Sequence, residues 1–147
     1  MSSCQDEQFD YPGRKEELRR QLQEADTPMT KFREEVFITL QVEGIHNWPG
    51  CPFDEVAYLR DPHRHMFHIK AHKIVTHSDR DVEFIMLKHR VQQYLLDTYS
   101  ESDFDVCVFG AMSCEMIAKE LITRFDLCSC EVSEDGENGA IVTVEEE

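Results

Sequence analysis

The chain has 147 residues, of which 41% are apolar, and a formal net charge of −15 at pH 7. That length is typical of one domain with a hydrophobic core of its own. The acidic excess argues against a nucleic-acid-binding groove, which needs clustered Lys and Arg. No apolar run approaches the roughly 20 residues of a membrane span.

The cysteine pattern indicates a cytoplasmic protein. The six cysteines form no C-x-x-C motif, and no secretory signal follows Met1. We therefore expect reduced thiols. The thiols are those of Cys4, Cys51, Cys107, Cys114, Cys128 and Cys130.

Residues 1–33 read as an extension before the main domain, which we place at residues 34–147. Within the extension, Arg14–Ala25 predicts a highly charged helix that ends before the Asp26-Thr27-Pro28 break. Its apolar content is limited to Leu18 and Leu22. We interpret it as an appendage or an assembly element.

Two long strands are predicted next, over about residues 35–44 and 65–77, with a Pro- and Gly-containing loop over 47–62 between them. Apolar residues alternate along the first strand. His46 falls at an alternate position, so it lies on the same strand face as these apolar residues. His63 and His65 share a strand face with Phe67 and Ile69, because side chains alternate along a strand.

An H-x-H pair on one strand face places two imidazoles roughly 7 Å apart, close enough for one metal ion to bridge them. A third imidazole from the neighbouring strand, His46, completes a three-histidine set of the kind that binds zinc with an open fourth position. The alternative is that these histidines are ordinary core residues. His68 and His72 have the opposite parity and are expected to be dispensable for metal binding.

A break at residues 78–80 and a short extended piece at Val82 and Phe84 follow. Over residues 84–99 the apolar residues then recur at helical spacing. A loop over about 100–112 follows, and Ser113 is placed to cap a second helix. Two final strands, LCSCEVSE and GAIVTVE, are joined by a glycine-containing turn. Glu134 has the parity of the apolar side of its strand.

The order is two strands, two helices and two strands. It predicts an α+β fold in which a four-stranded antiparallel sheet carries both helices on one face. Such a sheet has two open edges, so we expect a homo-oligomer.

Five short motifs in this order resemble the 6-pyruvoyl-tetrahydropterin synthase and 6-carboxy-tetrahydropterin synthase family of T-fold proteins. The resemblance covers roughly residues 37–144. Its motifs are a strand leading into His46, then Pro62-His63-Arg64-His65-Met66, Glu83-Phe84-Ile85-Met86-Leu87-Lys88, Met112-Ser113-Cys114-Glu115 and Glu134-Asp135-Gly136-Glu137-Asn138-Gly139-Ala140.

The resemblance implies a T-fold-like ββααββ domain with zinc on His46, His63 and His65. It also implies that Glu134 anchors a pterin-, deazapurine- or purine-like heterocycle, and that the subunits form trimers or hexamers. The chemistry of Glu134 agrees, since a carboxylate accepts two parallel N–H bonds from a 2-amino-4-oxo ring edge.

The chain departs from the family at its proton relay. Leu59 stands where catalytic members carry a cysteine, and the stretch after the first helix has no histidine for the Asp-His pair. A leucine cannot transfer protons. Cys51, Glu55 and Asp61 lie nearby in sequence but do not occupy the family positions.

Three functions therefore remain open. The chain is a T-fold zinc protein that binds such a ring and runs a divergent lyase or hydrolytic reaction at the metal, a non-enzymatic protein that binds or sequesters a heterocycle, or a structural assembly with histidines in its core.

Overall fold

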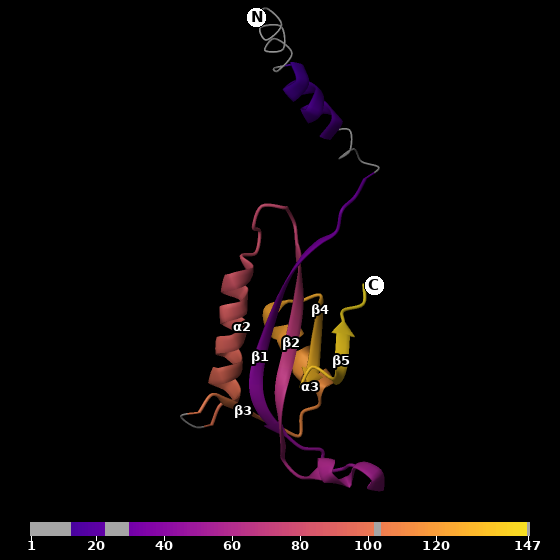
Figure 1. Ribbon diagram of the computed structural model, residues 1–147, viewed down its shortest axis with the longest axis vertical. Coiled ribbons are helices and arrows are strands. Elements are labelled where there is room, and N and C mark those ends of the chain that lie inside the picture. The colour runs from indigo at the N-terminus through magenta and orange to yellow at the C-terminus, as the bar shows by residue number, and fades with distance from the viewer. Residues whose placement is uncertain (1–12, 23–29, 102–103, 147) are drawn as a thin grey trace, which may run out of the picture. The chain divides into compact units, whose positions relative to one another are not determined.

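The computed structural model describes residues 13–22, 30–101 and 104–146 (Figure 1). Its contacts divide the chain into two units, Met1–Arg33 and Glu34–Glu147. In the first unit, residues 13–22 form a helix on which Leu18 and Leu22 are exposed. The end of the predicted helix, residues 23–25, lies outside the described residues.

The second unit is built on a five-stranded sheet with strand order β3-β1-β2-β4-β5. Strand β1 pairs antiparallel with β2, β2 with β4, and β4 with β5, whereas β3 runs parallel to β1. The strands are β1 (Glu34–His46), β2 (His63–Val75), β3 (Val106–Gly110), β4 (Ser129–Glu134) and β5 (Asn138–Thr143).

The predicted α+β class is confirmed, but the predicted four-stranded antiparallel sheet is wrong. The segment expected to be a loop, 100–112, contains β3, which pairs with the end of β1 from Glu43 to His46. Alternating burial of Cys107 and Phe109 anchors this short strand in the core. The sheet is therefore mixed.

Two helices, α2 (Phe84–Tyr99) and α3 (Cys114–Phe125), pack on one face of the sheet. Their buried side chains recur at helical spacing, such as Leu87, Val91 and Leu95 in α2. The hydroxyl of Ser113 accepts from Met116 N at 3.2 Å and caps α3 as predicted. Phe84 begins α2, so the extended piece predicted there is wrong.

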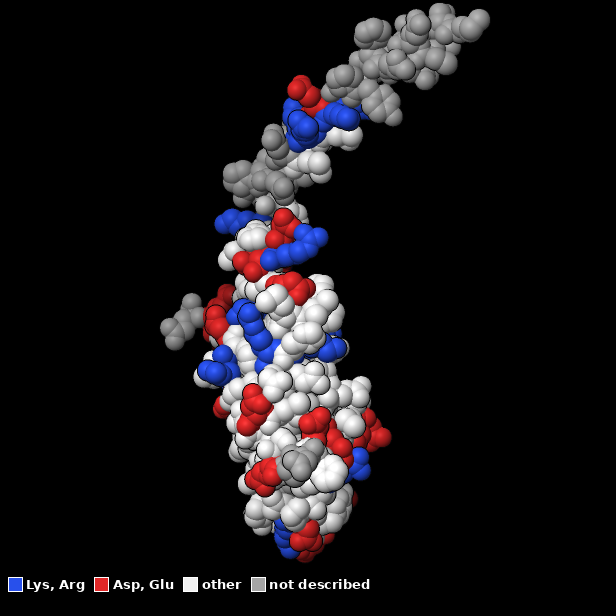
Figure 2. Space-filling model, turned by 90° about the vertical axis from the view of Figure 1, so that its left-hand side faces the viewer, with Lys and Arg blue, Asp and Glu red and all other residues white. Residues whose placement is uncertain are grey.

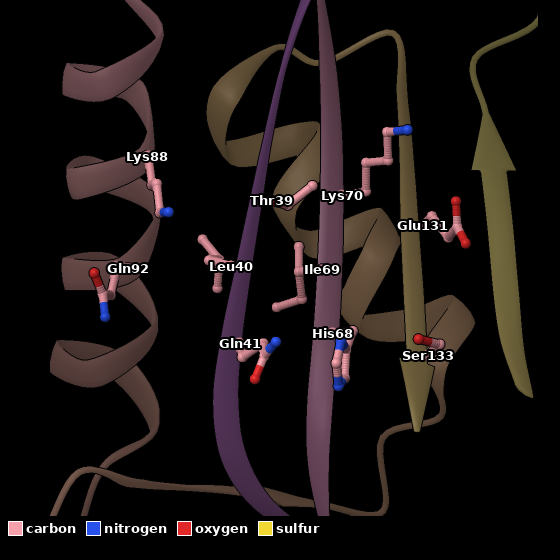
Figure 3. Close-up of a pocket in the computed structure, with 10 residues that line it drawn as sticks. All are labelled: Thr39, Leu40, Gln41, His68, Ile69, Lys70, Lys88, Gln92, Glu131 and Ser133. Carbon is pink, nitrogen blue, oxygen red and sulfur yellow. The ribbon is translucent and has the colours of Figure 1, made fainter. Parts of the chain in front are cut away.

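The apolar core lies between this helix layer and the helix-facing side of the sheet. Fully buried side chains from β2, β4 and both helices meet there. The opposite sheet face carries polar side chains, and Figure 3 shows Gln41, His68 and Ser133 side by side on three neighbouring strands, as their register requires. These polar side chains belong to a recess of about 570 Å³ that reaches from α2 across β1, β2 and β4.

Acidic and basic side chains are interspersed over the face that carries α2, without a continuous basic area among the described residues shown in Figure 2. Over the same described ranges, none of the helices has the length and apolar character that crossing a membrane requires.

The loop between β1 and β2 is ordered by hydrogen bonds between its two ends. Trp48 N donates to Leu59 O at 2.6 Å, and the Arg60 side chain donates to Cys51 O at 2.8 Å. A 3₁₀ segment, η1 (Asp54–Arg60), fills the loop where no regular structure was predicted. This loop brings Leu59 back beside the ends of the two strands.

Candidate metal centre

Three imidazoles meet at one end of the sheet. His46 is the last residue of β1 and pairs directly with His63, the first residue of β2, while His65 lies two residues further along the same face. The centroids of the three rings lie 4.6, 5.0 and 5.4 Å from one another. The strand parity thus placed all three predicted ligands together, although β2 begins two residues earlier than expected.

Each ring has its Nδ1 atom fixed by an oxygen. His46 Nδ1 lies 2.9 Å from Met112 O, His63 Nδ1 lies 2.9 Å from Asp61 O, and His65 Nδ1 lies 2.7 Å from a carboxylate oxygen of Asp135. Carbonyls and ionised carboxylates only accept hydrogen bonds, so each Nδ1 carries the hydrogen. In a neutral imidazole, Nε2 is then left with its lone pair, the form in which histidine binds a metal.

The three Nε2 atoms are buried, and within the described residues none has a hydrogen-bond partner. Leaving a buried polar atom unsatisfied costs about 1–3 kcal/mol. A group bound between three such atoms would therefore stabilise the arrangement.

Glu134, at the end of β4, joins the same point. Its Oε2 lies 2.7 Å from His65 Nε2 and 3.8 Å from His46 Nε2. The shorter contact does not have the direction of a hydrogen bond. One ligand atom from each of the four residues lies within 4.8 Å of the others, a group that could hold a metal ion.

A metal cation accounts for the cluster of three histidines and Glu134 better than a proton on His65 does. Protonating His65 Nε2 would give Glu134 a charged partner, but the Nε2 atoms of His46 and His63 would stay buried and unpaired. A cation satisfies all three nitrogens and the carboxylate together. The donor set of the site thus fits a metal ion.

Asp135 contacts the candidate site, although the sequence patterns did not single it out. Besides holding His65, its carboxylate accepts from Met66 N at 2.9 Å, while its own N–H donates to Met66 O at 2.7 Å. The hydrogen bond from the Met66 backbone lowers the pKa of the Asp135 carboxyl, and the bond from His65 acts in the same direction. The carboxylate is therefore ionised at neutral pH. Asp135 lies in the left-handed region, with φ of 58°, which aspartate adopts more readily than most residues.

A pocket of about 450 Å³ adjoins the cluster. Glu134 lies in its wall together with Leu59. Its full lining is His46, Asn47, Trp48, Leu59, His63, Ala111, Met112, Ser113, Cys114, Glu115, Met116, Glu134, Asn138 and Gly139.

The thiol that reaches this pocket is that of Cys114, not Cys51. Cys51 is buried within its own loop, where its Sγ faces the carbonyl oxygens of Phe53 and Val56 at 3.7 Å. The Sγ atom of Cys114 lies 4.0 Å from Glu134 Oε1. Burial raises the pKa of the Cys114 thiol to about 11, and the charges of Glu134 and Glu115 add to the effect.

The two histidines expected to be dispensable lie apart from the cluster. His68 lines the recess on the polar side of the sheet (Figure 3), and His72 lies 3.6 Å from a carboxylate oxygen of Glu35. His68 is therefore a matched control for His65.

Comparison with known proteins adds information on the fold. No protein-family model and no curated protein sequence matches this chain. The crystal structure of an uncharacterized protein from Wolinella succinogenes is similar, with a TM-score of 0.55 and 13% sequence identity over 78% of this chain and 100% of that chain. At this level of identity the likeness shows a shared fold alone.

Proposed function

We propose that this protein binds one zinc ion per chain through His46, His63 and His65 and holds a small heterocycle in the adjoining pocket. The observation that carries the proposal is the convergence of three buried Nε2 atoms whose opposite ring nitrogens are all fixed as donors. The layer of two helices on one sheet face supports a T-fold-like architecture, with β3 as an addition to the ββααββ order.

Zinc is the metal that this donor set favours. Neutral imidazoles suit zinc, and three of them with one further oxygen donor match its preferred tetrahedral coordination. The ion would act as a Lewis acid toward an oxygen of the bound molecule. The chain's own contribution is to hold the three rings in one orientation through Met112 O, Asp61 O and the Asp135 carboxylate.

The ligand class is a pterin-, deazapurine- or purine-like ring, as the resemblance to tetrahydropterin synthases implies. The pocket volume of about 450 Å³ lies within the usual range for small-molecule sites. Glu134 lies in its wall and offers two acceptor oxygens to the 2-amino-4-oxo edge of such a ring.

The pocket also bears on whether the protein is an enzyme. Leu59, at the family's cysteine position, lines the pocket and has no proton to transfer. Cys51 is enclosed in its loop and faces backbone carbonyls, so it does not replace that cysteine. These features favour the second candidate, a non-enzymatic protein that binds or sequesters its ligand, over a zinc-dependent lyase. Incubation with dihydroneopterin triphosphate distinguishes them, because only the enzyme converts it.

The test of the metal site is the zinc content of the purified wild-type protein, measured by mass spectrometry and compared with two variants. His65→Ala should retain less zinc than the wild-type protein, because it lacks one of the three imidazoles. His68→Ala, on the other sheet face, should retain it. Equal zinc in the wild-type and His65→Ala proteins would contradict the proposal.

A further inference from the structure

The two carboxylate oxygens of Glu134 face different neighbours. Oε2 points to the imidazoles, at 2.7 Å from His65 Nε2 and 3.8 Å from His46 Nε2. Oε1 is directed to the pocket wall, 4.0 Å from Cys114 Sγ. The side chain is about 23% exposed, so it is held between the two sites and not out in solvent.

These distances place Oε2 beside two of the imidazole nitrogens, so the carboxylate lies within reach of an ion bound between them. Donor atoms about 2.0–2.1 Å from a tetrahedral zinc lie about 3.3–3.4 Å from one another. Of the two N···O distances, 2.7 Å is shorter and 3.8 Å is longer than that value. Oε2 therefore lies close enough to the imidazoles to become a fourth ligand once the carboxylate moves.

Among the described His, Cys, Asp and Glu side chains, no other joins the group that could supply that fourth ligand. In the described part of the chain, the cluster that could hold a metal ion consists of the three histidines and Glu134. Leu59 lies beside the cluster in the pocket wall but offers no donor atom. Sites with four protein ligands are typical of structural zinc, whereas catalytic zinc keeps one position open.

We propose that Glu134 is the resting fourth ligand of the metal, and that binding of the heterocycle draws this carboxylate away and opens the metal. The inference rests on the proposed function, because it takes the metal and the ring to share one site. Glu134 cannot coordinate the ion through Oε2 and present both oxygens to a ring edge at the same time. Metal and ligand therefore compete for one carboxylate, and their binding is coupled.

Cobalt(II) tests the resting state, because its visible absorption reports coordination without any turnover. The full chain is loaded with Co²⁺ and titrated with azide, a small anion that occupies open positions. The wild-type spectrum should stay unchanged by azide. The Glu134→Ala spectrum should differ from wild type and should change further with azide. Its affinity for Co²⁺ should fall by at least about tenfold, the lower end of the loss for groups that only support metal ligands.

The matched control is Glu131→Ala, on the same strand but lining the recess on the other sheet face. It should behave as wild type in spectrum, azide response and cobalt affinity. Glu134→Gln keeps the size of the side chain and reports the same loss if the alanine variant fails to fold. An azide response in wild type equal to that of Glu134→Ala would overturn the proposal.

Neopterin, which has the 2-amino-4-oxo edge, tests whether ligand binding draws Glu134 away from the metal. When calorimetry registers its binding, the spectrum of the wild-type cobalt protein should change as Glu134 leaves the ion. Binding with an unchanged spectrum would overturn the opening step. Failure of the wild-type protein to take up cobalt would instead refute the proposed metal site, so the two failures are distinguishable.

Discussion

Asp135 holds His65, one of the proposed metal ligands, without being a proposed ligand itself. Its carboxylate bonds both His65 Nδ1 and Met66 N, so it sets the orientation and the protonation of that ring. We expect Asp135→Ala to weaken zinc binding by about 10–100-fold, the usual effect of removing such a partner. Chelator competition measures the change.

Asp61 provides the control for this prediction. It supports His63 through its backbone carbonyl, so Asp61→Ala leaves that hydrogen-bond acceptor in place and should bind zinc as wild type does. Equal zinc affinity of Asp135→Ala and wild type would show that His65 is held by packing alone.

Cys114 should be unreactive at neutral pH. Its thiol has a raised pKa of about 11, so the nucleophilic thiolate is scarce at pH 7 and its population rises about tenfold for each pH unit up to that value. Alkylation with iodoacetamide, followed by mass spectrometry, should proceed slowly at pH 7 and accelerate toward pH 10. Rapid modification at pH 7 would mean that the pocket stabilises the thiolate.

Strand parity was sufficient to predict that His46, His63 and His65 converge, because each lies near the end of a regular strand. It could not predict Asp135, which follows β4 in a left-handed conformation where alternation no longer applies. Nor could it show that Glu134 turns one oxygen toward the imidazoles, since that depends on how β4 sits beside β2. The sequence predicts which strand face the histidines and Glu134 lie on. The distances between them depend on how the strands pair.

At the scale of elements, the long strands and both helices could be predicted from their periodicity. Strand β3 could not, because its five residues are too few to separate a strand from an apolar loop. This strand is defined by a tertiary contact, its parallel pairing with the end of β1 at Glu43–His46.

The close packing of β1 against two aromatic rings requires Gly44. A Cβ there would lie 2.6 Å from Phe109 Cε2 and 2.7 Å from Phe67 Cδ2, and both rings are buried. We expect Gly44→Ala to lower the free energy of unfolding by about 1–3 kcal/mol, the usual cost of overpacking. Urea denaturation measures the loss.

Gly50→Ala is the matched substitution, since a Cβ at Gly50 meets nothing within 4 Å. Its unfolding midpoint should stay close to that of wild type. An equally mild effect at Gly44 would mean that the phenylalanine rings move aside at little cost.

For the molecule as a whole, we expect a homo-oligomer, as a trimer or a hexamer. Strand β3 pairs with the end of β1, so within the described part of the chain residues 34–42 of β1 have a strand partner on one side. Strand β5 forms the other edge, and Ile141 on it is 69% exposed. Unpaired edges of this kind favour association. Light scattering at micromolar concentration should give a mass of three or six chains, and a stable monomer would contradict the expectation.

The proposed metal site also has a consequence for the connectivity of the chain. His65 and Glu134 are separated by roughly 70 residues, and that segment contains both helices and β3. An ion held by both residues closes this segment into a ring, as a disulfide would. By the chain-entropy relation for disulfides, closing a loop of this length is worth about 4 kcal/mol. A bound ion would thus fasten the ends of β1, β2 and β4 and tie the helix layer to the sheet, so loading the metal is also a step in completing the fold.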